Sequence, residues 1–182
     1  MTASAPPPDA PVAQGPDADP ESVARTILLD ALTGRARSRA ELADRLAAKG
    51  VPADLGERLL DRFTEVGLVD DARFAEGWVH GRQQAKGLAR RALAAELRRK
   101  GVDDEVAREA LDTLPPEAEV EAARHLVRRR MRSLRSVDDQ TAVRRLVGML
   151  GRKGYPPGTA YAVVREELAA AGRDDEAVPY AE

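Results

Sequence analysis

Residues 42–51 read LADRLAAKGV, residues 93–102 read LAAELRRKGV and residues 146–155 read LVGMLGRKGY. The three stretches share two leucines four residues apart, followed by Lys, Gly and an apolar or aromatic residue. Their glycines are 51 and 53 residues apart. A nearly constant period of this length indicates an array built from one supersecondary unit. The sequence therefore predicts three tandem repeats.

Each copy predicts a helix, a glycine stop and a second helix. Leucines four residues apart share one helix face, Lys suits the negative end of the helix dipole, and Gly is the usual left-handed C-terminal stop. Pro52 and Pro156 suit the opening turn of the next helix. A further helix is expected before each pair, over 23–33, 70–84 and 116–134, and Ser38 and Glu41 form a capping box. We therefore expect about nine helices and an all-α fold, in which three tandem three-helix repeats form an elongated, curved array.

The same patterns divide the chain. Six of its 12 prolines fall within the first 20 residues, where the other residues are too small and polar to build a packed core. We expect a disordered, acidic, proline-rich N-terminal tail over 1–22, repeats over 23–68, 69–114 and 115–171, and an acidic, flexible C-terminal tail over 172–182. Because each repeat covers its neighbour's apolar face, we expect a monomer.

Composition excludes several classes of protein. The chain has no cysteine, which excludes disulfides, thiolate metal sites and cysteine nucleophiles and fits a cytoplasmic location. The N-terminal 22 residues contain no basic residue and no apolar run, so we expect no targeting signal. The longest aliphatic run, Ile27 to Leu29, is too short for a membrane span. Aromatic residues make up 3% of the chain, which disfavours base-stacking nucleic-acid modules.

No catalytic site can be assembled from the sequence. The two histidines, His80 and His125, lie in different repeats without acidic partners at metal-ligand spacing, and exposed helix histidines are the simpler interpretation. Glycines within 148–154 lack the preceding strand that a phosphate-binding loop requires. Asp70 and Asp71 suit a helix cap and first turn better than a metal pair. We therefore expect a protein that is not an enzyme and has no cofactor.

Basic residues are concentrated in the second and third repeats. The segment 82–101 holds seven basic residues against one acidic, and 124–153 holds ten against two. The segment 23–66 is nearly balanced, with eight against seven. Charge runs often form only solvated helix faces, but a compositional bias toward arginine would spread the charge evenly. We therefore predict a surface for a polyanion or an acidic protein, gathered along one flank of the array.

Residues 67–75, which read GLVDDARFA, resemble the signature of the RecX family. Trp78, Val79 and Arg82 follow in the family's order, and the ELxxKG pattern within 93–102 completes the match. Ser38, Glu41 and Leu42 resemble the family's first repeat, and the likeness extends over about 23–171. One departure is residues 83–88, QQAKGL, where many members have a glycine-rich turn ending in arginine; Arg90 or Arg91 takes that place here.

The resemblance implies a regulator that binds the RecA–DNA filament and inhibits its recombinase, ATPase and co-protease activities, and so modulates DNA repair and the SOS response. Contact with single- or double-stranded DNA is left open. The docking residues we expect are basic: Arg82, Arg90, Arg91, Lys100, Arg128, Arg129, Arg132, Arg144, Arg145 and Lys153. Asp70, Asp71, Phe74 and Trp78 would position the helix that carries part of this set. Phe74 and Trp78 share a helix face and are expected in the core, with a partner-facing Trp78 as the sharper alternative.

A second interpretation is a transcription regulator that binds double-stranded DNA directly. The helix–glycine–helix units superficially resemble a helix-turn-helix. That motif predicts one dominant recognition helix, whereas the sequence contains three similar copies.

Overall fold

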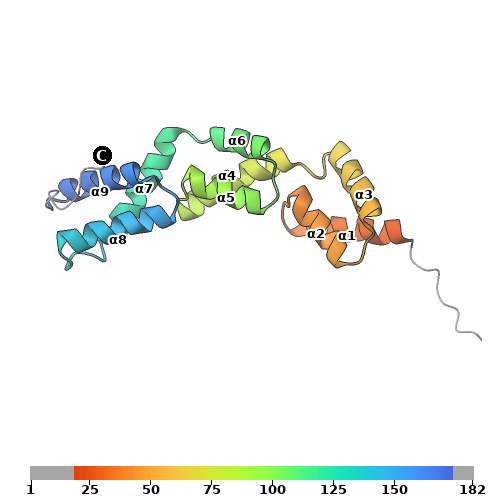
Figure 1. Ribbon diagram of the computed structural model, residues 1–182, viewed down its shortest axis with the longest axis horizontal. Coiled ribbons are helices and arrows are strands. Elements are labelled where there is room, and N and C mark those ends of the chain that lie inside the picture. The colour runs from red at the N-terminus through yellow and green to blue at the C-terminus, as the bar shows by residue number, and fades with distance from the viewer. Residues whose placement is uncertain (1–18, 174–182) are drawn as a thin grey trace, which may run out of the picture.

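The computed structural model describes residues 19–173, which form nine α-helices and no strand. The first repeat contains α1 (Pro20–Gly34), α2 (Arg39–Ala48) and α3 (Ala53–Glu65); the second contains α4 (Asp71–Lys86), α5 (Arg90–Arg99) and α6 (Asp104–Asp112); the third contains α7 (Pro116–Met131), α8 (Asp139–Arg152) and α9 (Pro157–Ala170). Figure 1 shows the three units following one another in an elongated, arched array. The predicted all-α repeat fold is confirmed.

The helix boundaries follow from local signals. Gly50, Gly101 and Gly154 all have positive φ, between 69° and 92°. In each repeat the amide after this glycine donates back to the carbonyl of the second conserved leucine, at 3.1–3.2 Å. This backward bond is the signature of a helix that ends in a left-handed residue. The predicted glycine stop is therefore present in all three repeats.

The predicted caps are also present. Ser38 and Glu41 form the capping box of α2, and Asp70 accepts from the amide of Arg73 at the start of α4. The first helix begins at Pro20, three residues earlier than expected, because Asp19 accepts from the amide of Ser22 and extends the helix. The expected tails over 1–22 and 172–182 otherwise lie largely outside the described residues.

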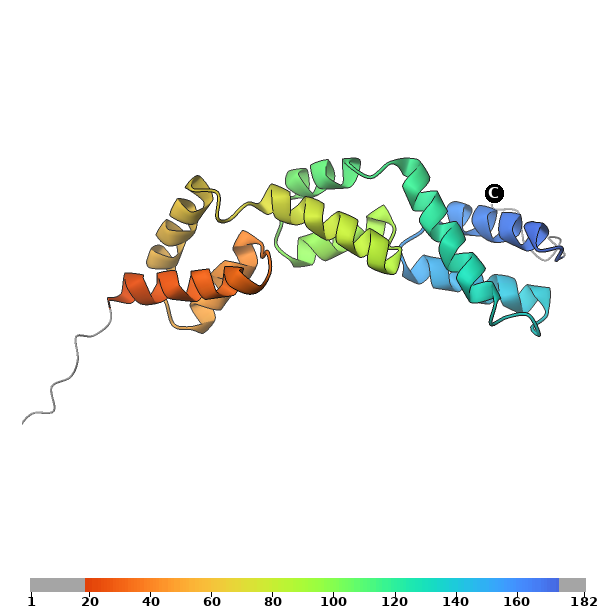
Figure 2. The ribbon, with the colours of Figure 1, turned by 180° about the vertical axis from the view of Figure 1, so that it is seen from behind.

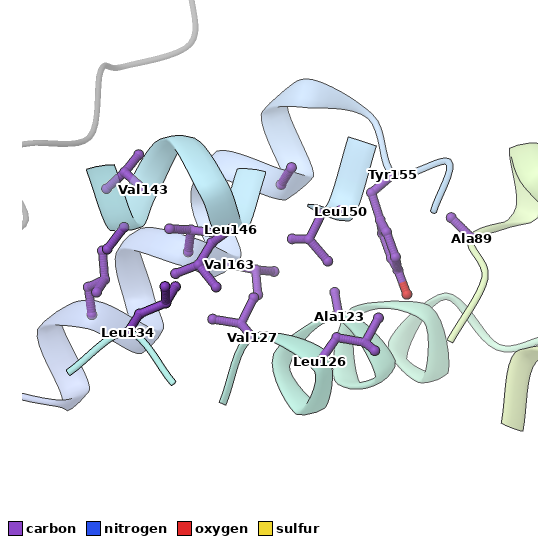
Figure 3. Close-up of a cluster of buried hydrophobic side chains, with 14 residues drawn as sticks. Ala89, Ala123, Leu126, Val127, Leu134, Val143, Leu146, Leu150, Tyr155 and Val163 are labelled. Atoms are coloured by element: carbon purple, nitrogen blue, oxygen red, sulfur yellow. The ribbon is translucent and has the colours of Figure 1, made fainter. Parts of the chain in front are cut away.

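Each repeat has a hydrophobic core of its own. The first core runs from Ala24 to Val69 and the second from Phe74 to Leu114. The third runs from Ala123 to Leu168 and also takes in Ala89 of the second repeat. Figure 3 shows this third cluster, with Tyr155 lying between the body of the core and Ala89. The second and third repeats thus share apolar packing, whereas the first keeps a separate core.

The helices of each repeat take equivalent places. In Figure 1 the second helices, α2, α5 and α8, lie toward the lower edge, and the third helices, α3, α6 and α9, toward the upper edge. Figure 2, seen from behind, shows α4 and α7 running in front of the helices that they pack against. Within residues 19–173, no helix is both long enough and apolar enough to cross a lipid bilayer.

Candidate functional site

The ten basic side chains expected to dock a partner fall into two groups. Five of them have partners within the chain: Arg82, Arg90, Lys100, Arg128 and Lys153. The other five are exposed and form no ion pair within residues 19–173: Arg91, Arg129, Arg132, Arg144 and Arg145. The two groups therefore contribute differently to any surface for a partner.

Trp78 lies at the centre of a cluster that links the first two repeats. The Arg82 guanidinium lies 4.7 Å from the centroid of the indole ring and the Lys100 ammonium 4.8 Å from it. The indole N–H donates to Glu96 at 2.9 Å, and Arg82 forms a two-point ion pair with the same carboxylate at 2.8 and 3.0 Å. Lys100 also pairs with Glu41 of α2. This cluster, which we call the tryptophan joint, uses Arg82 and Lys100 inside the protein.

Phe74 and Trp78 share one helix face, as predicted, and their rings stack. Their ring centroids are 5.7 Å apart, Phe74 is buried in the core of the second repeat, and Trp78 is partly buried against it. Phe74 therefore supports the Trp78 ring of the tryptophan joint from the core of the second repeat.

The carboxylates of the tryptophan joint are held in their charged form. Partial burial acts to raise the pKa of Glu41, but hydrogen bonds from Lys100 and from the Ser38 amide outweigh it and lower that pKa below its usual range. The pKa of Glu96 is lowered in the same way, because bonds from Arg82 and Trp78 outweigh the effect of burial. A carboxylate with a depressed pKa stabilises the folded state at pH values above its unfolded pKa, which is ~4.3 for Glu. That contribution is lost as the pH falls through the folded pKa.

We expect Glu41→Gln to weaken the tryptophan joint by about 1 kcal/mol, because Lys100 loses its charged partner while half-buried. The fluorescence of Trp78, the single tryptophan of the chain, should report the opening of the joint during unfolding. In the parent this opening should become easier as the pH falls below ~4.3, and the variant should lose part of that dependence. Glu76→Gln, on an exposed position of α4, is the control. It should change neither the stability of the tryptophan joint nor the pH dependence of its opening. Equal pH profiles for Glu41→Gln and the parent would contradict the assignment.

The joint between the first two repeats is completed by two backbone contacts. The buried Ser38 hydroxyl donates to the carbonyl of Lys100 at 2.6 Å, so the N-cap residue of one repeat's second helix is bound to the end of the next repeat's second helix. The amide of Arg39 donates to Asp71 at 2.7 Å. Asp71, expected to help position this region, therefore anchors α4 to α2.

The second and third repeats are joined at equivalent positions. The amide of Ala89 donates to the carbonyl of Lys153 at 3.0 Å, and the amide of Arg90 donates to Glu119 at 3.2 Å. The phenol of Tyr155 donates to the carbonyls of Gly87 and Glu119, at 3.2 and 3.3 Å, and burial raises its pKa to about 12. This second joint therefore adds a buried aromatic side chain to the polar contacts.

Arg90 and Arg128 serve mainly to hold helices together. Arg90 pairs with Asp112 at 3.3 Å and donates to the carbonyl of Leu114, just as Arg39, at the same place in the first repeat, pairs with Glu57 and Asp61. Arg128 forms a two-point ion pair with Glu167, with both distances 2.8 Å. The Glu167 side chain is 9% exposed, so Arg128 satisfies a carboxylate that is nearly removed from water.

The five exposed arginines do not gather in one cleft. Arg129 lies near Lys153. The pKa of Lys153 is lowered by its partial burial and by the positive charges of Arg129 and Lys86. Arg132 lines a different groove, between the ends of α7 and α9, together with Arg135. Arg144 and Arg145 lie on the exposed face of α8 and Arg91 on that of α5. The unpaired charge is thus distributed over α5, α7 and α8.

Comparison of the repeats identifies two further exposed arginines beside two that were expected to dock a partner. Arg91 and Arg144 both lie two residues before the first conserved leucine, and Arg99 and Arg152 both lie two residues before the glycine stop. The corresponding residues of the first repeat are Ala40 and Ala48. All four arginines are exposed. Arg99 and Arg152 were not among the expected docking residues, although aligning the repeats would have revealed them.

Comparison with known proteins agrees with this architecture. Models of the first, second and third three-helix domains of RecX match residues 24–63, 70–111 and 117–164. The chain is 52% identical over 161 residues to a regulatory protein RecX of Thermobifida fusca, covering 87% of each chain. It is 51% identical over 158 residues to one of Amycolatopsis mediterranei, covering 87% of this chain and 90% of the other.

A crystal structure of RecX from Lactobacillus salivarius superimposes with a TM-score of 0.75 at 20% identity, covering 84% of this chain and 99% of the other. At that identity the likeness concerns the fold, whereas the sequence matches over all three repeats establish the relationship. The chain therefore belongs to the RecX family of regulatory proteins.

Proposed function

We propose that this protein is a non-enzymatic, cytoplasmic and monomeric regulator that binds the RecA–DNA filament and inhibits its recombinase, ATPase and co-protease activities. By this route it modulates DNA repair and the SOS response. The family relationship supports a regulatory role, because the relatives are named regulatory proteins, and RecA is the partner that the resemblance to the family implies. The observation that carries the proposal is the set of exposed, unpaired arginines on α5, α7 and α8.

The shape and the charge both suit a long polyanionic partner. A three-repeat array presents an extended surface, and a nucleoprotein filament offers a long, negatively charged groove. Five exposed arginines can make ion pairs with such a partner, because no carboxylate within residues 19–173 forms an ion pair with them: Arg91, Arg129, Arg132, Arg144 and Arg145. The other five basic residues support this surface by holding helices together within a repeat or by joining one repeat to the next: Arg82, Arg90, Lys100, Arg128 and Lys153.

The decisive experiment combines an activity and a binding measurement. Addition of the protein should suppress the ATPase activity of RecA on single-stranded DNA, and the protein should sediment with RecA filaments. If phosphate groups contribute, the bound fraction should fall steeply as salt rises. Unchanged ATPase activity at a saturating bound fraction would contradict the inhibitory role.

A parallel titration with duplex DNA, without RecA, tests the transcription-regulator alternative. Our proposal predicts weak binding with no preference between a random duplex and a sequence obtained by selection. Tight binding to a selected sequence alone would favour the alternative.

A further inference from the structure

A groove between the ends of α7 and α9 carries positive charge that no group within residues 19–173 neutralises. Its volume is about 450 Å³. Its lining residues are Arg128, Met131, Arg132, Arg135, Glu167, Ala170, Ala171 and Arg173. The ion pair of Arg128 with Glu167 is complete in itself, and Arg173 pairs with Asp139. Arg132 and Arg135 remain as two exposed arginines beside the apolar surface of Met131 and the two alanines.

Arg173 fixes the point at which the chain leaves the described structure. Its guanidinium donates to Asp139 at 2.5 Å, to the carbonyl of Val137 at 2.6 Å and to the carbonyl of Leu134 at 3.1 Å. These three bonds clamp the end of the third repeat against the loop between α7 and α8, beside Arg135. The residues that follow Arg173 therefore start at the edge of the groove.

Those following residues have the complementary chemistry. Residues 174–182 read DDEAVPYAE, with Asp174 and Asp175 directly after the clamp and Val178 and Tyr180 further on. An extended chain spans about 3.3 Å per residue, so every position in this segment can reach the groove. A segment tethered this closely is present at an effective concentration in the millimolar range, so weak contacts are enough to fill the site.

We propose that the acidic segment 174–182 binds in this groove, with Asp174 and Asp175 against Arg132 and Arg135 and its apolar side chains against Met131. Because Arg132 belongs to the docking set, the bound segment competes with a polyanionic partner and limits the protein's affinity for it. This second statement rests on the proposed function, whereas the intramolecular contact does not. The tests also resolve two other outcomes. A polyanion could bind in the groove without competition from the segment, or the segment of a second copy could bind there.

The contact itself can be tested with a spin label. The chain has no cysteine, so Ala181→Cys provides a single site for a nitroxide. In the full-length protein at low salt, the label should broaden the NMR signals of residues 131–135 and 170–171. The broadening should vanish at ~1 M salt, where the screening length falls to ~3 Å, and in a variant that also carries Asp174→Asn and Asp175→Asn.

A label at Ser4→Cys is the control and should leave these signals sharp. Broadening that is confined to the residues next to the label, or that does not respond to salt, would overturn the proposal. Broadening that appears only in mixtures of labelled and unlabelled protein, with isotope on the unlabelled copy, would assign the groove to a second copy and reject the intramolecular contact.

The competition can be measured with a fluorescein-labelled oligothymidylate as the polyanionic probe. Asp174→Asn with Asp175→Asn should tighten its binding about three- to tenfold at low salt, as expected for the release of two exposed ion pairs. Asp9→Asn with Asp17→Asn changes the net charge equally and should tighten it less than twofold. Equal effects of the two pairs would mean that only net charge matters, and would overturn the competition while leaving RecA inhibition to be judged by its own assay.

Discussion

Reversal of the charge at Arg129 and Arg132 together should weaken binding to the RecA–DNA filament by on the order of a hundredfold at low salt. Both arginines are exposed. Their replacement by glutamate removes two attractive charges and adds two repulsive ones without breaking an ion pair within residues 19–173. The same reversal at Arg144 and Arg145 should act similarly. Co-sedimentation across a salt series measures the affinity, and the slope of log affinity against log salt should decrease by about 1 for each phosphate that the protein no longer neutralises.

The matched control is the reversal of Arg45 and Arg62 in the first repeat. These arginines are also exposed and form no ion pair within residues 19–173. Because two arginines are replaced by two glutamates in each variant, the change in net charge is the same. Because the first repeat carries a nearly balanced charge, this variant should bind within about threefold of the parent. If the control and the two test variants weaken binding equally, long-range charge and not a located surface explains the binding.

Gly101→Ala should destabilise the protein by about 3 kcal/mol and separate the first repeat from the second. Gly101 has φ of +69°, and a Cβ there would overlap the Cβ of Ala40 in α2. The left-handed conformation costs an alanine roughly 1–2 kcal/mol, and the overlap with a neighbouring helix adds a further ~1–3 kcal/mol. Denaturant unfolding followed by the fluorescence of Trp78, which lies in the tryptophan joint, measures the effect.

Two variants separate these contributions. Gly50→Ala takes the same conformation, with φ of +76°, but no atom lies within 4 Å of the added Cβ, so it should cost about 1 kcal/mol. Ala40→Gly removes the opposing Cβ and should rescue Gly101→Ala, with a coupling energy of about 2 kcal/mol in the double-mutant cycle. Gly50→Ala and Gly101→Ala could instead lower the free energy of unfolding equally, with no rescue of Gly101→Ala by Ala40→Gly. That result would show that close approach of the repeats does not require glycine at this joint.

Local signals account for much of what could be predicted about the fold. The capping box of Ser38 and Glu41, the glycine stops and the leucine spacing act between residues within about five positions of one another, so a repeated pattern predicts repeated helices. The same signals also show how the three repeats align with one another, because each glycine stop ends the second helix of its repeat. The helix α1 starts three residues before the position that apolar periodicity predicts, because the cap at Asp19 precedes the first periodic residue.

The docking residues were harder to predict, because the charge of an arginine is visible in the sequence while its neutralisation is not. Lys100 meets Glu41 from 59 positions away, and Arg128 meets Glu167 from 39 positions away. No local pattern relates these partners. A basic run therefore mixes side chains that hold helices or repeats together with side chains that remain free for a partner.

The sequence by itself determined that this protein is an array of three helical repeats of the RecX family with excess positive charge in the last two, because these properties follow from local patterns and from composition. Only the tertiary structure decided how that charge is divided between internal joints and exposed surface. The physical reason is that an ion pair depends on the distance between atoms in space, and the packing of helices within and between repeats decides whether a basic side chain meets a partner or stays in water.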